Sequence, residues 1–243
     1  MASHCPVTGT RSQTEVRDRF DMTVTYAMHN ALRRELHFIA RATARADPDP
    51  ESEPDPRHIL RTAVGWTLFR RALRAHQTAE DDVLWPSLRQ ALFGRPLCLA
   101  RLEAIEAEHA VLDQLLEAID QALVGPDLGL DLFADLTGSL VTGLRGHLRH
   151  EEESVFPVAQ VVLSEGQWER FERAHAQLIQ ADAAWILPWL LDGAAERTVA
   201  AVLAALLPES AHHAYTDQWQ PAYAMLDRWG APRSLSEPRN PHV

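Results

Sequence analysis

Apolar residues recur at intervals of three and four along most of the chain, and this spacing predicts amphipathic helices. Runs of β-branched residues alternating with polar ones, the pattern typical of strands, are almost missing. Four long helices are predicted at about 14–45, 57–92, 96–123 and 130–163, the last one interrupted near Pro157. Three shorter helices are predicted at about 165–187, 194–207 and 209–229.

The connections between these helices predict how they pack. Residues 46–56 alternate proline with acidic residues, which can neither continue a helix nor bury apolar surface. The other connections are short, so neighbouring helices should be antiparallel, and we expect residues 14–163 to form an all-α, up-down four-helix bundle. We expect residues 165–229 to be a helical extension packed on this bundle, and residues 1–13 and 230–243 to be flexible tails.

Composition narrows the function. The chain has 23 Lys and Arg against 34 Asp and Glu, a net charge of −11, which argues against nucleic acid or an anionic membrane as the main partner. Two cysteines are too few for a disulfide scaffold or a thiolate-rich metal site, whereas twelve histidines are many for this length. Because the chain shows neither a signal peptide nor an apolar run long enough to span a membrane, we expect a cytoplasmic location.

An internal repeat brings histidine and glutamate to matching positions. Residues 76–86 (HQTAEDDVLWP) match residues 147–157 (HLRHEEESVFP), and residues 28–32 (MHNAL) match residues 108–112 (EHAVL). The spacing between the two histidines of each half is 47 and 38 residues, and the acidic proline loop accounts for the difference. Since positions i and i+4 share a helix face, each histidine can act with the glutamate that follows it. The inward-facing set is then His29, His76, Glu80, His109, His147 and Glu151.

Imidazole and carboxylate without thiolate suit iron, manganese or zinc. Four histidines and two glutamates are more than the roughly three protein ligands of a catalytic zinc, so two metal ions fit the set better. If both glutamates and an oxo or hydroxo group bridge the metals, about two of the roughly twelve positions around two octahedral ions remain open.

This set of residues resembles the hemerythrin-like, or HHE cation-binding, family over about residues 16–162. The family pattern H…HxxxE…H…HxxxE is matched at all six positions, and HNALRREL at residues 29–36 is similar to the family's first helix. A C-terminal extension makes the chain similar to actinobacterial-type members. The resemblance implies a non-haem centre of two iron ions that reacts with dioxygen, nitric oxide or peroxide, with manganese or zinc as weaker alternatives.

Reversible oxygen carriers of this family have a further histidine four residues after the position of His109, where this chain has Asp113. Asp113 lies one turn beyond His109, so it is a candidate ligand, and an anionic ligand would favour the ferric state. We therefore expect a di-iron oxidoreductase that activates oxygen or decomposes peroxide, either oxygenase-like or catalase-like. The alternative is a protein that binds or senses dioxygen or nitric oxide without turnover, and iron storage or a structural metal is a weaker third reading.

Other residues carry less specific signals. Tyr26 and His150 are candidates, with Asp113, for a further ligand or for a contact to one. We expect the acids that follow Glu80 and Glu151 to be mostly solvated, with some accepting hydrogen bonds from ligand imidazoles. His175 has no partner pattern and is expected to be structural or solvated, and the tryptophans after residue 165 to pack the extension or cap the site. A small-molecule substrate and a homodimer remain open, and no catalytic residue beyond the metal ligands is predicted.

Overall fold

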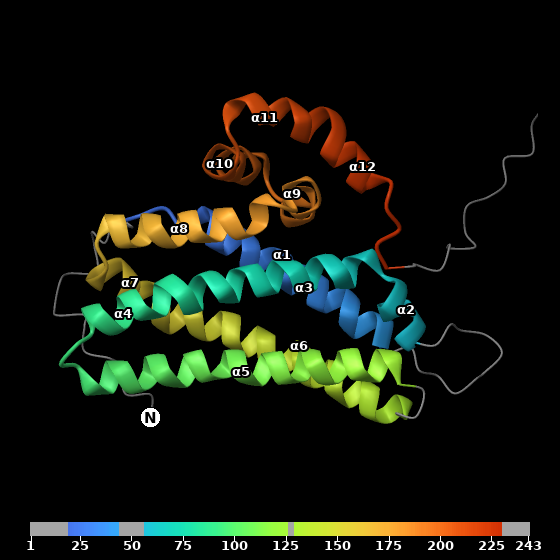
Figure 1. Ribbon diagram of the computed structural model, residues 1–243, viewed down its shortest axis with the longest axis horizontal. Helices are drawn as coiled ribbons and strands as arrows, with labels where there is room; N and C mark the ends of the chain where they lie inside the picture. Colours follow the sequence, from blue (N-terminus) through green and yellow to red (C-terminus); the bar gives the residue numbers. More distant parts are fainter. Residues whose placement is uncertain (1–18, 44–55, 126–128, 230–243) are drawn as a thin grey trace, which may run out of the picture.

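The computed structural model describes residues 19–43, 56–125 and 129–229, and these residues form helices and no strand (Figure 1). The prediction of an all-α helical bundle is confirmed. The expected tails, 1–13 and 230–243, and nearly all of the acidic proline segment lie outside the described residues. Among the described helices, none is both long and apolar enough to cross a bilayer.

Four rods of helix build the bundle (Figure 1). The first and third rods are each one helix, α1 (Thr23–Thr43) and α5 (Pro96–Val124). The other two rods are composite. The second consists of α3 (Val64–Ala79), η1 (Glu80–Leu84) and α4 (Trp85–Ala91). The fourth consists of α6 (Leu130–His150), η2 (Glu151–Val155) and α7 (Phe156–Val162). The short α2 (Pro56–Thr62) precedes α3, so the single helix expected over 57–92 is divided.

The segments η1 and η2 are π-helical, and each begins at the glutamate of the repeat. The N–H groups of Trp85 and Phe156 donate to carbonyls five residues back instead of four. A proline, Pro86 or Pro157, comes two residues after the end of each segment; it has no N–H, and its ring clashes with the carbonyl four residues before it. A π-turn relieves this clash without ending the rod. The apolar spacing did not predict this local widening, which follows each glutamate along the chain.

The C-terminal helices stack against one side of the bundle (Figure 1). They are α8 (Glu165–Gln180), α9 (Ala183–Leu191), α10 (Glu196–Leu206), α11 (Glu209–Ala214), η3 (Tyr215–Trp219) and α12 (Gln220–Ala224). Helix α8 begins with a capping box between Ser164 and Gln167 and packs on α3 and η1, while α9 and α10 pack on α1. The C-terminal helices therefore cover α1, α3 and η1, which carry the first half of the repeat.

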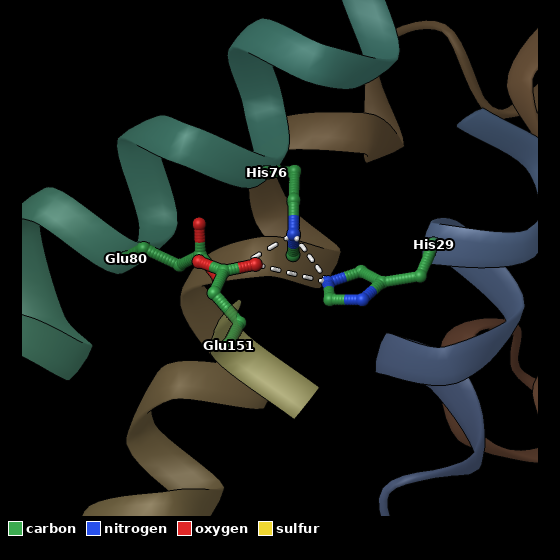
Figure 2. A group of neighbouring side chains, drawn as sticks. All are labelled: His29, His76, Glu80 and Glu151. Atoms are coloured by element: carbon green, nitrogen blue, oxygen red, sulfur yellow. Dashed lines mark hydrogen bonds and ion pairs between the residues drawn. The ribbon is translucent and has the colours of Figure 1, made fainter. Parts of the chain in front are cut away.

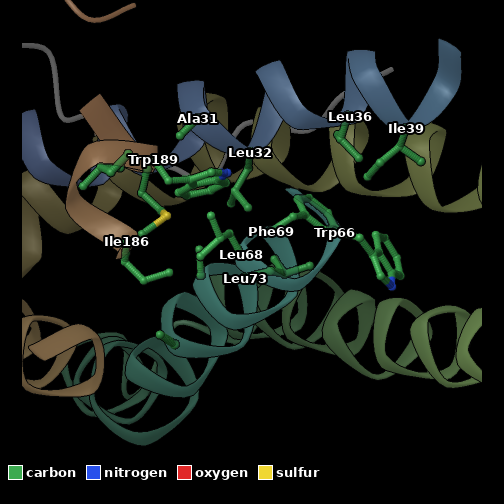
Figure 3. Packing of buried hydrophobic residues seen from close by; sticks show 14 of the residues in the cluster. Ala31, Leu32, Leu36, Ile39, Trp66, Leu68, Phe69, Leu73, Ile186 and Trp189 are labelled. Atoms are coloured by element: carbon green, nitrogen blue, oxygen red, sulfur yellow. The ribbon is translucent and has the colours of Figure 1, made fainter. Parts of the chain in front are cut away.

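Two separate apolar clusters fill the interior. One extends through the bundle to the C-terminal helices, and its part between α1, α3 and α9 includes Leu32, Phe69 and Trp189 (Figure 3). The other surrounds Trp85 and Phe156 beyond the π-helical segments. Each large side chain that is fully buried contributes about 1.5–3 kcal/mol. The histidines and glutamates of the repeat lie along the helices between these two clusters, which keep water away from them.

Candidate metal centre

Six polar side chains that the repeat predicts to meet do lie together at the middle of the bundle. All six residues are at most 4% exposed, and they are His29 on α1, His76 on α3, Glu80 on η1, His109 on α5, His147 on α6 and Glu151 on η2. They form two overlapping groups in which the potential ligand atoms lie within 4.8 Å of one another. The first group is His29, His76, Glu80 and Glu151 (Figure 2).

The second group consists of His109, His147 and the same two glutamates. Because Glu80 and Glu151 belong to both groups, each carboxylate lies where it can bridge two ions. Each glutamate contacts the histidine four residues before it and one histidine from the other half. Glu80 lies 3.4 Å from His76 and 3.5 Å from His109, and Glu151 lies 3.2 Å from His147 and 3.3 Å from His29.

The histidines also meet in two equivalent pairs. The Nε2 atoms of His29 and His76 are 3.0 Å apart, and so are those of His109 and His147. Equal distances at equivalent positions show that the sequence repeat corresponds to an approximate two-fold symmetry of the site. Two metal ions related by this symmetry would each have two imidazole nitrogens and two shared carboxylates within reach.

Carboxylates outside the cluster bind the other ring nitrogen of three histidines. The Nδ1 of His109 is 2.8 Å from Asp81, that of His29 is 2.8 Å from Glu152, and that of His147 is 2.9 Å from Glu108. A carboxylate can only accept, so each Nδ1 carries a proton and the Nε2 lone pair is directed into the cluster. This is the arrangement in which histidine ligates a metal while a neighbouring carboxylate holds the ring.

The chemistry of the cluster fits bound cations. The lone pairs of His109 and His147 face each other 3.0 Å apart, which is repulsive unless a cation or an extra proton lies between them. All four carboxylate oxygens of Glu80 and Glu151 are buried with no hydrogen-bond partner. Buried charges without hydrogen bonds are costly, and metal ligation would remove that cost. The donor set of imidazole nitrogen and carboxylate oxygen suits iron, manganese or zinc.

The ionisation of the residues follows from this crowding. Burial raises the pKa of Glu80 well above its usual value, and the nearby charge of Glu151 raises it further. Burial acts against the ionised form of His147, but Glu151 and Glu108 outweigh it and raise the pKa of His147 to about 9. Burial and the charge of His29 lower the pKa of His76. Without metal, the proton on His147 is the cation that separates its Nε2 from that of His109.

Comparison with protein-family models gives two matches to the hemerythrin HHE cation-binding domain, at residues 23–159 and 102–217. Together they span all the helices described above except the last one and its short flanks. The chain belongs to the hemerythrin HHE cation-binding family. Comparisons with curated proteins and with solved structures found no match.

The further candidates for the HHE centre lie outside both groups. Tyr26 is 41% exposed and packs edge-on against Phe156, with ring centroids 5.8 Å apart. His150 is half-exposed, and its Nδ1 lies 2.9 Å from Glu108, so it contacts a residue that holds His147. Asp113 is exposed and lines a cleft between α3 and α5. The inner face of α5 next to His109 is occupied by Leu112 instead.

That cleft has a volume of about 430 Å³ and reaches Asp81, the residue that binds His109. Its wall includes Arg74 and Gln77, and the Nε2 of Gln77 is buried without a partner. The side chain of Asp81 is 46% exposed, more than that of Glu108 or Glu152. Asp81 thus connects a histidine of the HHE centre with a polar opening at the surface.

Two residues around the centre were not predicted from the sequence. Glu108 precedes His109 but binds His147 on the next helix, so no spacing within one helix could reveal it. His175 on α8 is fully buried, with its ring centroid 5.4 Å from that of His76. A signal for His175 exists, because residues 174–178 (AHAQL) are similar to EHAVL at residues 108–112.

Proposed function

We propose that this HHE protein is a non-haem di-iron protein that reacts with dioxygen or peroxide by redox turnover. His29 and His76 would hold one ion, His109 and His147 the other, and Glu80 and Glu151 would bridge both. When bound, two iron ions supply Lewis-acid and redox chemistry toward these oxygen species. The six residues leave several positions of two six-coordinate ions for a small exogenous ligand.

The carboxylates behind the histidines are the observation that supports turnover over reversible carriage. Asp81, Glu108 and Glu152 accept the Nδ1–H of three of the four histidines. A carboxylate acceptor makes the imidazole more basic and a stronger donor, which favours the more oxidised state of a bound metal. Two of these acceptors serve the His109–His147 pair, so that pair would stabilise a ferric ion most strongly. Reversible carriage requires an easily restored diferrous state, which this environment disfavours.

The position of Asp113 adds to this argument. It points to the cleft and away from the cluster, so no fifth histidine or equivalent side chain from α5 fills a position at the second pair. Asp81 at the end of the same cleft would hold the proton of His109 and exchange it with solvent. Arg74 and Gln77 would orient polar molecules that enter there, and the apolar clusters around Trp85 and Leu32 would exclude bulk water.

One experiment separates turnover from carriage. The protein is loaded anaerobically with ferrous iron to about two ions per chain, mixed with oxygenated buffer and then purged with argon. We expect irreversible oxidation in the visible spectrum and, after addition of hydrogen peroxide, steady consumption with oxygen release or with oxidation of an added electron donor. Recovery of the diferrous spectrum on purging, with no peroxide consumption, would show that the protein is a carrier or sensor.

The matched control is Asp82→Asn, which alters an exposed acid beside Asp81 and should leave these reactions unchanged. His147→Ala should abolish them together with iron binding. If the His147→Ala protein retained the full iron content and the same reaction, the assignment of the centre would be wrong.

A further inference from the structure

The approximate symmetry of the centre is broken at one residue, His76. The Nδ1 atoms of His29, His109 and His147 each have a carboxylate partner, but the Nδ1 of His76 is buried and has none. The reason is visible in the repeat. Glu108 precedes His109 and binds His147, whereas the equivalent residue before His29 is Met28, which cannot accept the proton of His76.

A second unpartnered nitrogen lies next to this one. His175 of α8 is 1% exposed, and its Nε2 has no hydrogen-bond partner. The ring centroids of His76 and His175 are 5.4 Å apart. The His29–His76 pair, whose nitrogens are 3.0 Å apart, has a centroid distance of 5.0 Å. The rings of His76 and His175 are therefore only slightly farther apart than two imidazoles whose nitrogens lie 3.0 Å from each other.

We infer that His175 is the missing acceptor. The two nitrogens lie in neighbouring rings and are not hydrogen-bonded in this structure, and with metal bound the Nδ1–H of His76 would donate to the Nε2 of His175 and so position His76 as a ligand. A neutral imidazole has one donor and one acceptor nitrogen, so it can take this role without adding charge. One hydrogen bond then satisfies two buried polar atoms that would otherwise each cost about 1–3 kcal/mol. This inference rests on the proposed metal centre, because it assigns a role to His175 through the ligand His76.

The organisation of the C-terminal helices supports this role independently. The segment η3 begins at Tyr215 and is followed six residues later by Pro221, just as Pro86 follows Glu80 and Pro157 follows Glu151. The second family match, over residues 102–217, extends through α8 to η3. The extension is thus a third, divergent copy of the HHE helix pair, in which His175 keeps the histidine of the first helix.

In this third copy the other ligands are lost, because Tyr215 stands in place of the glutamate and Ala211 in place of the second histidine. His175 cannot therefore belong to a third metal position. Helix α8 instead packs on α3 and brings the histidine to the bundle's own centre. A residue inherited from a ligand position has become the support of a ligand.

The consequence is that the two metal positions are inequivalent. The histidines of one position are held by Asp81 and Glu108, two anions, and those of the other by Glu152 and the neutral His175. Neutral support makes His76 a weaker electron donor than His147. The ion at the His29–His76 position is expected to be the first to be reduced and the first to be lost to a chelator.

Metal titration tests this. Cobalt(II) is added anaerobically to the metal-free protein in competition with a chromophoric chelator, and the two binding steps are resolved. In His175→Leu one step should weaken about 10- to 100-fold while the other stays unchanged. His175→Gln, whose amide oxygen can accept, should restore most of the affinity. Met28→Glu in the His175→Leu background supplies a carboxylate from the position equivalent to Glu108 and should also restore it.

Glu108→Leu is the matched control because it removes the equivalent acceptor from His147 at the other position. The double variant with His175→Leu should weaken both steps, one for each substitution. If both substitutions weakened the same binding step and left the other unchanged, the assignment of His175 to His76 would be wrong.

A spectroscopic measurement excludes a purely structural role. In the zinc-loaded protein labelled with nitrogen-15, the ligand histidines should give slowly exchanging Nδ1–H signals, and His175→Leu should remove or strongly shift the signal of His76 alone. Equal weakening of both binding steps without rescue by glutamine, or an unchanged His76 signal, would overturn the inference. If the wild type itself failed to bind two ions, the proposed function would fail instead.

Discussion

Asp81 and Glu152 occupy equivalent places and act across the two halves of the repeat. Each directly follows a core glutamate, and each accepts the Nδ1–H of a histidine from the other half, at 2.8 Å in both cases. Their surroundings differ, because Glu152 is also clamped by Arg33, whereas Asp81 opens to the cleft. The two halves therefore contact each other through these hydrogen bonds as well as through the six residues of the cluster.

Asp81→Asn tests this link. An amide can present its NH₂ group to His109 and no longer enforces the tautomer with the lone pair on Nε2. We expect about 10- to 100-fold weaker binding of one of the two metal ions, measured by chelator competition. Asp82→Asn changes the same charge one residue away and should leave both affinities unchanged. Equal effects of the two substitutions would indicate a general loss of charge instead of a specific hydrogen bond.

Much of this centre could be predicted from local spacing, because a helix brings residues four apart onto one face. The HxxxE pairs identified His76 with Glu80 and His147 with Glu151, and the acids that follow were expected to include partners of imidazoles. As metal ligands, the six residues stay a prediction until metal binding is measured. Asp113 shows the limit of this reasoning, since one turn beyond His109 also lies about 40° around the helix, and here that rotation turns it to the cleft.

The remaining features depend on contacts between helices. Glu108 and His175 are recognised only when α6 and α3 are placed beside their helices. The π-turns at Glu80 and Glu151 depend on the prolines that follow and on the packing that keeps each rod continuous. Helix propensity and apolar periodicity along one segment carry no information about contacts between helices or about the π-turns.

Glu80→Gln should separate metal binding from stability. Burial of Glu80 next to Glu151 raises its pKa, so the ionised form destabilises the metal-free fold. An uncharged amide of the same shape should stabilise the metal-free protein by about 1 kcal/mol or more at neutral pH, as measured by urea unfolding. The same variant should lose most of its affinity for metal. A less stable metal-free variant would show that the carboxylate is accommodated without metal.

Metal binding should release protons. The pKa of His147 is raised to about 9 in the metal-free protein, so His147 is protonated at neutral pH, and a metal ligand must be deprotonated. Calorimetry at pH 7 in buffers of different ionisation enthalpy should report about one proton or more released per chain. Glu108→Gln removes one of the charges that raise this pKa and should reduce the release. Binding without proton release would contradict the protonated state of His147.

The stability of the metal-free protein should depend on pH for the same reason. A histidine with a raised folded-state pKa stabilises fully below its unfolded-state value, and this contribution is lost as the pH rises through about 9. The pKa of Glu152 is lowered to about 2, because hydrogen bonds from His29 and Arg33 outweigh its burial. Its contribution is present above the unfolded-state value and is lost as the pH falls toward 2. Urea midpoints should therefore decline on both sides, and His147→Leu should flatten the alkaline side.

Glu35 on α1 joins the bundle to the C-terminal helices, and its removal should weaken that junction. This carboxylate is fully buried and accepts hydrogen bonds from Trp229 at 2.8 Å, Arg34 at 3.0 Å and Arg228 at 3.3 Å. Breaking a buried charge network by removing one partner costs about 3–5 kcal/mol. Glu35→Ala should lower the free energy of unfolding by an amount of that order. Asp182→Ala breaks the exposed pair with Arg71, which is worth at most about 1 kcal/mol, and serves as the control. If the two variants were equally stable, the junction would depend on apolar packing alone.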